Sequence, residues 1–278
     1  MTDSFKVSVV VPCFNDGDFL PEAVASVINI RRHDVELIVV DDGSTDERTR
    51  KEIDAFSAQG IKVVRQENKG LAAARNAGIL VSQGEYILPL DADNRLRLGY
   101  VEHGIRVLDA NPHIGVVYGD AEYIGMRTGR WHVGSFERDR LLRWNYIDAC
   151  AVYRRSIWEQ NYGYDGTMPI QGLEDWDFWL SALAHGWEFA YVPEVLFEYR
   201  VRENSMIARA SGFEAPIEEF IATKHGLLYR QTWLQLVIER ESMKASTRNL
   251  FQLLKCRLKR KIALNKIEYT GITKLPPR

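Results

Sequence analysis

The stretch "VELIVVDDGSTDERT", Val35–Thr49, decides the fold class of this chain. A nearly continuous apolar run is followed at once by Asp41, Asp42 and Gly43. Such runs, rather than alternating ones, are typical of strands buried on both faces of a parallel sheet. Ser44 and Glu47 have the spacing of a capping box, which predicts that a helix opens directly after the acids. The stretch therefore indicates a buried strand that leads into a helix.

The same alternation continues on both sides of this stretch. Four further β-branched runs are predicted to be strands, at residues 7–12, 61–65, 85–91 and 114–120. Amphipathic segments long enough for crossover helices separate the earlier runs. This pattern predicts an α/β fold with a mostly parallel sheet flanked by helices.

The second half of the chain has a different character. Aromatic-rich segments follow residue 120, and Trp176, Trp179, Leu180 and Leu183 have the spacing of one helical face. Residues 188–201 are predicted to form a strand, a proline turn and a second strand, and residues 214–266 are predicted to be helical. We expect one domain over 1–212, divided into a first half at 1–120 and a second half at 121–212. A basic helical extension over 213–278 would follow.

Composition excludes several classes of protein. The 36 basic and 38 acidic residues give a net charge of −2, so nucleic acid is not an expected partner. The three cysteines form no C-x-x-C pair, which argues against a disulfide framework or a zinc site. No leader-like N-terminus or bilayer-length apolar run is present, so a cytoplasmic location is expected.

The C-terminal stretch is basic and amphipathic. No acidic residue lies between Ser242 and Ile267, whereas lysines and arginines alternate there with Leu250, Leu254 and Leu258. One hypothesis is peripheral contact with an anionic membrane surface, at the inner face of the cell membrane. The other is a helix that packs back on the catalytic domain.

Two pairs of acids are predicted to share one edge of the sheet. Asp41 and Asp42 end the second predicted strand, and Asp91 and Asp93 end the fourth. Ligands of open parallel sheets bind at the carboxyl ends of the strands. Converging carboxylates would repel one another unless a cation lay between them, and Mg²⁺ or Mn²⁺ suits such oxygens. The alternative is that Asp42-Gly43-Ser44 is only turn and cap chemistry.

Five segments, in order, carry a resemblance to a known family. They are "VVVPCFN", "VVDDGSTD", "NKGLAAARNAG", "LDADN" and "LEDWDFW". In this order and spacing they resemble the GT-A glycosyltransferases of family 2, over about Val7–Ser205. Each segment alone is a weak signal, and the series is a strong one. The resemblance implies a GT-A fold and inverting transfer of a sugar from a nucleotide-diphosphate donor. It also implies that 1–212 is a catalytic domain with a nucleotide-binding half at 1–120 and an acceptor half at 121–212.

The resemblance also implies roles for residues of the donor site. Pro12 and Phe14 would line the nucleoside pocket, Asp42 would accept a hydrogen bond from the base, and Arg75 would hold the nucleotide. UDP is the expected nucleotide, because of the likeness at Asp42. A divalent cation and a basic side chain are what a leaving diphosphate requires.

Two further segments are assigned by the same resemblance. In "LDADN", Asp91 would face the ribose and the metal, and Asp93 would bind the metal, Mn²⁺ or Mg²⁺. Asp175 matches the family's general base, which takes the proton of the acceptor hydroxyl. Its neighbour Glu174 points about 100° away on a helix, so Asp175 is the expected base. The alternative for both is the favourable interaction of acids with a helix N-terminus.

The segment "YRVRENSM" departs from the family pattern. A histidine that can ligate the metal often stands where this chain has Arg202, and arginine stays protonated. Either Asp93, the diphosphate and water hold the metal, or Arg202 replaces part of its charge. Arg200 and Arg202 are expected to contact the diphosphate as bidentate donors.

The expected function is an inverting glycosyltransferase that uses a UDP-sugar. Its acceptor would be a glycan or a lipid-linked sugar in cell-envelope polysaccharide or glycoconjugate synthesis. The alternatives are a nucleotidyltransferase and a non-catalytic nucleotide-sugar binding module. A Rossmann dehydrogenase is disfavoured, because no G-x-G-x-x-G follows the first predicted strand.

Overall fold

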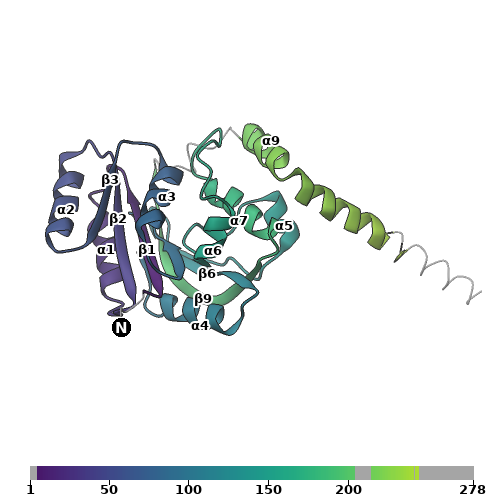
Figure 1. Ribbon diagram of the computed structural model, residues 1–278, viewed down its shortest axis with the longest axis horizontal. Helices are drawn as coiled ribbons and strands as arrows, with labels where there is room; N and C mark the ends of the chain where they lie inside the picture. The colour runs from purple at the N-terminus through teal and green to yellow at the C-terminus, as the bar shows by residue number, and fades with distance from the viewer. Residues whose placement is uncertain (1–4, 204–213, 241, 244–278) are drawn as a thin grey trace, which may run out of the picture. The chain divides into compact units, whose positions relative to one another are not determined.

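The computed structural model describes residues 5–203, 214–240, 242 and 243 (Figure 1). The first half contains β1 (Val7–Cys13), α1 (Leu20–Ile28), β2 (Val35–Asp42), α2 (Glu47–Ala58), β3 (Lys62–Gln66), α3 (Leu71–Val81), β4 (Tyr86–Pro89), β5 (Arg95–Leu96), α4 (Tyr100–Ala110) and β6 (Ile114–Gly125). The second half contains β7 (Gly129–Trp131), α5 (Arg138–Arg143), β8 (Val152–Arg154), α6 (Arg155–Gln160), α7 (Glu174–Ala184), β9 (Glu188–Val201) and α9 (Glu214–Lys224).

The strands that the structure describes form one sheet, in the order β3-β2-β1-β4-β8-β6-β9-β5, with β7 paired to β6. The pairs β3–β2, β2–β1 and β1–β4 are parallel, which confirms the prediction for the first half. In the second half β8 is antiparallel to both β4 and β6, and β6 is parallel to β9. The carboxyl ends of β1, β2 and β4 therefore lie at one edge.

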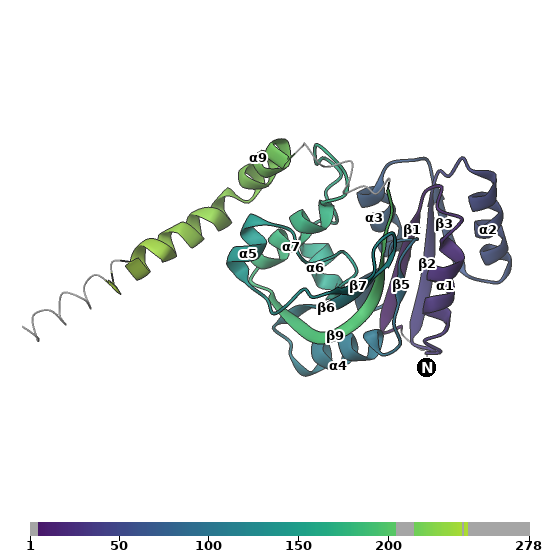
Figure 2. The same cartoon turned by 180° about the vertical axis from the view of Figure 1, so that it is seen from behind.

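Helices cover both faces of the parallel part (Figures 1 and 2). Side chains alternate between the two faces of a strand, so Val9 and Val11 of β1 pack with α1 on one side. Val10 faces the opposite side, where α3 lies against it: a Cβ added to Gly78 would sit 2.4 Å from Val10 Cγ1. Glycine at this position thus lets α3 approach the sheet closely, which places Arg75 near the strand ends.

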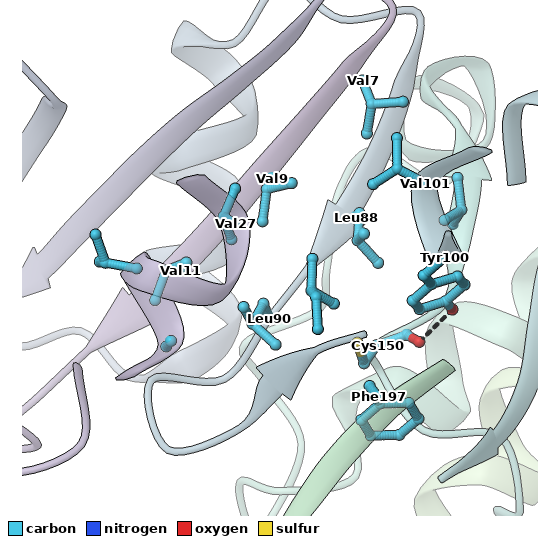
Figure 3. Packing of buried hydrophobic residues seen from close by; sticks show 14 of the residues in the cluster. Val7, Val9, Val11, Val27, Leu88, Leu90, Tyr100, Val101, Cys150 and Phe197 are labelled. Atoms are coloured by element: carbon cyan, nitrogen blue, oxygen red, sulfur yellow. Dashed lines mark hydrogen bonds between the residues drawn. The ribbon is translucent and has the colours of Figure 1, made fainter. Parts of the chain in front are cut away.

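A cluster of buried apolar residues lies on the α1 and α4 side of the sheet (Figure 3). It joins Val7 and Val11 of β1 with Leu88 of β4 and Val101 of α4. The Tyr100 hydroxyl is buried there and donates to the Cys150 carbonyl oxygen at 2.6 Å, which satisfies the polar atom. On the other face Tyr153 of β8 contacts the rings of Phe178 and Trp179 of α7. This aromatic packing holds α7 against the sheet.

Two local predictions are wrong. The helix after Asp42 is not capped by Ser44: it begins at Glu47, and Asp46 is the cap, its carboxylate accepting from Thr49 N at 2.7 Å. Ser44 Oγ instead accepts from Asn15 N at 3.2 Å, because the loop after β1 lies beside it.

The proline turn predicted within 188–201 is also absent, since β9 is one strand. Its register against β6 shifts between Gly119↔Val192 and Asp120↔Val195. The residues between Val192 and Val195 are therefore accommodated as a bulge rather than as a turn.

The chain divides into two compact units between His225 and Gly226. In the first unit, α9 begins at Glu214, as predicted, and its last residue Lys224 contacts Asp177 of α7 at 2.8 Å. A second helix covers 226–240. The basic stretch from Lys244 onward lies outside the described residues. Within the described part of the chain, no helix is both long enough and apolar enough to cross a bilayer. Cys13 and Cys150 are buried free thiols, and Cys256 lies outside the described residues.

Candidate active site

The loop after β4 presents the second acid pair. Leu90 is buried, and Asn94 N donates to the Asp91 carbonyl oxygen at 3.0 Å, so the chain turns between the two acids. Asp93 is mostly buried, and its side chain is 13% exposed. Burial raises the pKa of Asp93 to about 7, the charge of Asp91 adds to the shift, and Arg202 opposes it. The carboxyl of Asp93 therefore lies in a region with an excess of negative charge.

Arg75 of α3 connects this loop to α7. Its side chain is fully buried, with Nη2 2.8 Å from Asp91 Oδ1 and Nη1 paired with Glu174 Oε1. The Nε atom of Arg75 has no hydrogen-bond partner among the described residues. The guanidinium thus joins the "LDADN" and "LEDWDFW" segments, which are far apart in the sequence.

Glu174 and Asp175 begin α7, and both are buried. Glu174 also accepts from Gly172 N at 2.8 Å, whereas Asp175 Oδ1 accepts from Trp176 N at 2.9 Å. Burial raises the pKa of Asp175 well above its ordinary value, the charge of Glu174 adds to the shift, and Arg75 opposes it. The two neighbours therefore differ in role: one is paired with arginine, and the other is a buried carboxyl with strong affinity for a proton.

The helix that carries these acids is fixed by two indole groups. Trp176 Nε1 donates to the Leu141 carbonyl oxygen at 2.7 Å, and Trp179 Nε1 donates to that of Ile147 at 3.0 Å. Both rings are buried, so these tryptophans are structural and not platforms for an acceptor sugar.

Two site residues were missed by sequence reasoning. Asp148, in the loop before β8, has its pKa raised to about 7 by burial and by the charges of Asp91 and Asp93. Asn145 forms a side-chain hydrogen bond with Asp175, and its amide oxygen has no partner among the described residues. Neither lies in a spaced pattern, so only tertiary structure brings them here.

The end of β9 supplies two arginines. Arg200 Nε donates to the Asp93 carbonyl oxygen at 2.9 Å, and Arg200 Nη2 contacts Glu22 Oε2 at 2.6 Å. Arg202 Nε lies 2.7 Å from Asp93 Oδ2. Arg202 Nη1 lies 2.6 Å from Oδ1 of Asp16, another residue that sequence reasoning missed. Both predicted arginines are therefore at the site.

The first acid pair has other partners. Asp42 is buried: its Oδ1 accepts from Gln66 Nε2 at 2.7 Å and from Lys69 N at 2.9 Å, and its Oδ2 accepts from Gly70 N at 2.9 Å. Asp41 Oδ1 accepts from Ser44 N at 2.8 Å. Among the described residues, no hydrogen bond or ion pair joins this pair to Asp91 or Asp93.

The predicted nucleoside pocket lies at the end of β1. Pro12 is buried and sits opposite Val40 of β2. β1 pairs with β4 only over Val7–Val10, so the missing N–H of proline breaks no bond to β4. Phe14 follows the strand and is 42% exposed, which leaves its ring open to a ligand.

The carboxylates of this site are candidate ligands of a divalent cation. Among the described residues, no group of three or more His, Cys, Asp or Glu side chains is arranged to hold a metal ion. The carboxylates of Asp91 and Asp93 nevertheless suit Mg²⁺ or Mn²⁺, and the charge of Asp91 adds to the effect of burial in raising the pKa of both Asp93 and Asp148. The chemistry of Asp91 and Asp93 therefore fits a metal whose other ligands come from the diphosphate and water.

Comparisons with known proteins agree with this geometry. Residues 8–168 match the family model of glycosyl transferase family 2. Glycosyltransferase GlyG of Streptococcus pneumoniae is 41% identical over 118 residues, which cover 40% of this chain and 39% of that protein. An uncharacterized glycosyltransferase of Haemophilus influenzae is 27% identical over 217 residues, covering 71% and 66%. The chain thus spans less than two thirds of the length of either relative.

Two solved structures share the fold. One is Staphylococcus aureus TarS 1–349 in complex with UDP-GlcNAc, with a TM-score of 0.61 and 19% identity over 73% of this chain and 61% of that one. The other is the mannosyltransferase PcManGT of Pyrobaculum calidifontis in complex with GDP-Man and Mn²⁺, with a TM-score of 0.58 and 19% identity over 80% and 70%. They confirm the predicted GT-A fold. The chain therefore belongs to glycosyl transferase family 2, whose members are inverting enzymes.

Proposed function

We propose that this chain transfers a sugar from a UDP-sugar to an acceptor hydroxyl with inversion at the anomeric carbon. The observation that carries the proposal is the buried Arg75, which contacts Asp91 on the donor side and Glu174 beside Asp175. Through Arg75, the carboxyl of Asp175, whose pKa is raised, belongs to the same charge network as Asp91, which is proposed to hold the divalent cation.

Asp175 is the proposed general base. Its Oδ1 accepts from Trp176 N, and the Asn145 side chain also forms a hydrogen bond with the carboxylate, so a remaining lone pair would accept the proton of the acceptor hydroxyl. As the acceptor oxygen bonds to the anomeric carbon, its proton passes to Asp175 and the bond to the diphosphate breaks on the opposite side. The Asn145 amide oxygen, which has no partner among the described residues, would orient the incoming hydroxyl.

The leaving diphosphate is the proposed ligand of the remaining charged groups. Arg200 and Arg202 would contact its oxygens, and Asp91 and Asp93 would hold the divalent cation. When bound, that cation supplies positive charge that stabilises the leaving group. PcManGT, which shares the fold, was solved with Mn²⁺, and this supports the assignment.

UDP is the proposed nucleotide, with Asp42 contacting the base. A carboxylate has about four acceptor positions, and three are used here, so Oδ2 of Asp42 retains one for an N–H of the base. Phe14 is exposed beside the end of β1, where the nucleoside is expected. The complex of TarS with UDP-GlcNAc is consistent with this choice.

A binding screen tests the donor. The melting temperature would be measured with UDP, GDP, CMP and dTDP, each with and without Mn²⁺. We expect UDP with Mn²⁺ to stabilise most, since a ligand at a hundredfold excess over Kd adds about 2.7 kcal/mol. Larger stabilisation by another nucleotide would contradict the base, and no stabilisation by any of them would contradict nucleotide-sugar transfer.

We further propose a glycan or lipid-linked acceptor in cell-envelope synthesis, with peripheral membrane contact by the C-terminal extension. The helix over 226–240 exposes Leu227, Leu234 and Ile238, whose i, i+7, i+11 spacing places them on one face of the helix. Lysines and arginines follow in the sequence. An apolar helix face flanked by basic residues is typical of helices that lie on anionic membranes.

Liposome flotation tests the membrane contact. The full chain is expected to float with vesicles containing anionic lipid and to remain unbound with neutral ones. A chain that ends before Ser242 should float less. Equal flotation of the two chains, or none of either, would contradict the proposed contact.

A further inference from the structure

Arg202 joins three segments at the donor site. Its Nη1 lies 2.6 Å from Asp16 Oδ1 in the loop after β1, and its Nε lies 2.7 Å from Asp93 Oδ2 in the loop after β4. Its guanidinium also lies over the ring of Phe19, with Cζ 5.1 Å from the ring centroid. The side chain is one-third exposed, so the guanidinium is held in place and still reaches solvent.

The neighbouring Arg200 contacts the backbone and Asn94 rather than the carboxylate of Asp93. It donates from Nε to the carbonyl oxygen of Asp93, and its own N–H donates to Asn94 Oδ1 at 2.9 Å. These contacts fix the backbone of the loop after β4. Arg202 instead contacts the carboxylate of Asp93, and among the described residues it is the cation paired with that carboxylate.

A guanidinium and a divalent cation compete for this carboxylate. Arginine stays protonated, so a metal that approached Asp93 would meet a positive charge already in ion-pair contact with its ligand, although Arg202 Nε has no hydrogen-bond partner among the described residues. A diphosphate reverses this balance, because it offers Arg202 oxygens that suit bidentate hydrogen bonds.

We propose that Arg202 keeps divalent cations off Asp93 until a nucleotide diphosphate is bound, and then moves from Asp93 to the diphosphate. The inference rests on the proposed function, since it takes Asp93 as a metal ligand in a nucleotide-diphosphate site. Metal and nucleotide would then strengthen each other's binding, because each removes an obstacle to the other. Asp16 would retain the guanidinium near the site during the exchange.

Mn²⁺ binding measured by electron paramagnetic resonance of the free ion tests the proposal without any measurement of activity. The proteins are the full chain, Arg202→Met, the double variant Arg202→Met with Asp93→Asn, and Arg97→Met as a matched control. Arg97 is a half-buried arginine whose side chain pairs with Glu122 of β6 and Glu198 of β9.

The full chain should bind Mn²⁺ weakly alone and more tightly when UDP is added. Arg202→Met should bind Mn²⁺ alone at least about tenfold more tightly than the full chain, because a competing unit charge is removed from the ligand. The double variant should lose this gain, and Arg97→Met should match the full chain. Arg202→Lys, which keeps the charge, should bind Mn²⁺ less tightly than Arg202→Met and serves if the methionine variant does not fold.

The outcomes separate this inference from the proposed function. If UDP binds but the Mn²⁺ affinity of Arg202→Met equals that of the full chain, the inference is wrong and the proposed function stands. If UDP binds none of the proteins, the proposed function fails, and this inference fails with it. If the double variant keeps the tighter Mn²⁺ binding of Arg202→Met, the metal does not bind at Asp93. This result would also overturn the inference.

Discussion

The two acid pairs at the strand ends look alike in the sequence and differ in how their charge is stabilised. Asp41 and Asp42, at the end of β2, accept hydrogen bonds from Ser44, Lys69 and Gly70 backbone N–H groups. Asp91 and Asp93, after β4, face Arg75 and Arg202 and lie close to other carboxyls. The first pair organises a loop, whereas the second retains an excess of negative charge. Unsatisfied charge, rather than the presence of acids, marks the site of chemistry.

The largest effect is expected on the side of the second pair, at Asp175. Asp175→Asn should lower kcat by about 10²–10⁴-fold, the usual contribution of a general base, with donor affinity retained. Steady-state kinetics and UDP calorimetry would measure the two quantities. Asp177→Asn is the matched control on the same helical turn: it loses the contacts with Lys224 and His225 and so should lower the melting temperature but keep transfer per folded molecule. Unchanged transfer by Asp175→Asn would remove this residue from the mechanism.

A comparison of the stabilities of Asp42→Asn and Asp93→Asn tests the difference between the two acid pairs directly. Asp42→Asn should lower the free energy of unfolding by about 1–3 kcal/mol, because an amide NH₂ would face one of three donors. Asp93→Asn should leave it unchanged or raise it, since the raised pKa of Asp93 means that its charge is unfavourable in the fold. Urea denaturation near pH 7 measures both. Asp18→Asn, at an exposed acid, is the control, and equal losses at positions 42 and 93 would contradict the contrast.

Asp120 of β6 is a third acid whose contribution to stability should depend on pH. Burial alone would raise its pKa, but hydrogen bonds from Val133 N, His132, Tyr191 and Arg130 lower it to about 2. A lowered pKa contributes stability above the ordinary value near 4, and this contribution is lost as the pH falls toward about 2. The lowered pKa of Asp120 contributes about 2 kcal/mol to the free energy of unfolding. The stability difference between the wild type and Asp120→Asn should therefore shrink below about pH 4, and a constant difference would contradict the assignment.

The smallest expected effect is a shift in the pH dependence of transfer. Asp175 must be deprotonated to act as a base, and after burial, the charge of Glu174 is the main cause of its raised pKa. Glu174→Gln should therefore move the acid limb of the kcat profile to lower pH. The limb would not move if Glu174 served only to hold Arg75.

Much of the fold could be predicted because the signals are local. The apolar runs at Val7–Pro12 and Val35–Asp41 mark strands whichever partners they meet, and their alternation with helices leads to a parallel sheet. The capping-box prediction is wrong because Ser44 accepts a hydrogen bond from Asn15, which is distant in the sequence. Asp46 caps the helix instead. The turn predicted at Pro193 is absent because β6 is a long partner strand, and its pairing with β9 accommodates a bulge.

The candidate site was predictable only where a residue lies in a recognisable segment. Arg75, Asp93 and Asp175 were assigned from their motifs, and the structure places all three in one charge network. Asp16, Asn145 and Asp148 have no such spacing, because their role depends on which strand ends and loops meet.

The sequence by itself determined the order of strands and helices, the family and the residues at the carboxyl edge of the sheet, since these depend on patterns among near neighbours. Only the tertiary structure decided which carboxylates are neutralised. Electrostatic energy depends on distance and burial in space, so Asp42 and Asp93 acquire opposite properties from partners far along the chain.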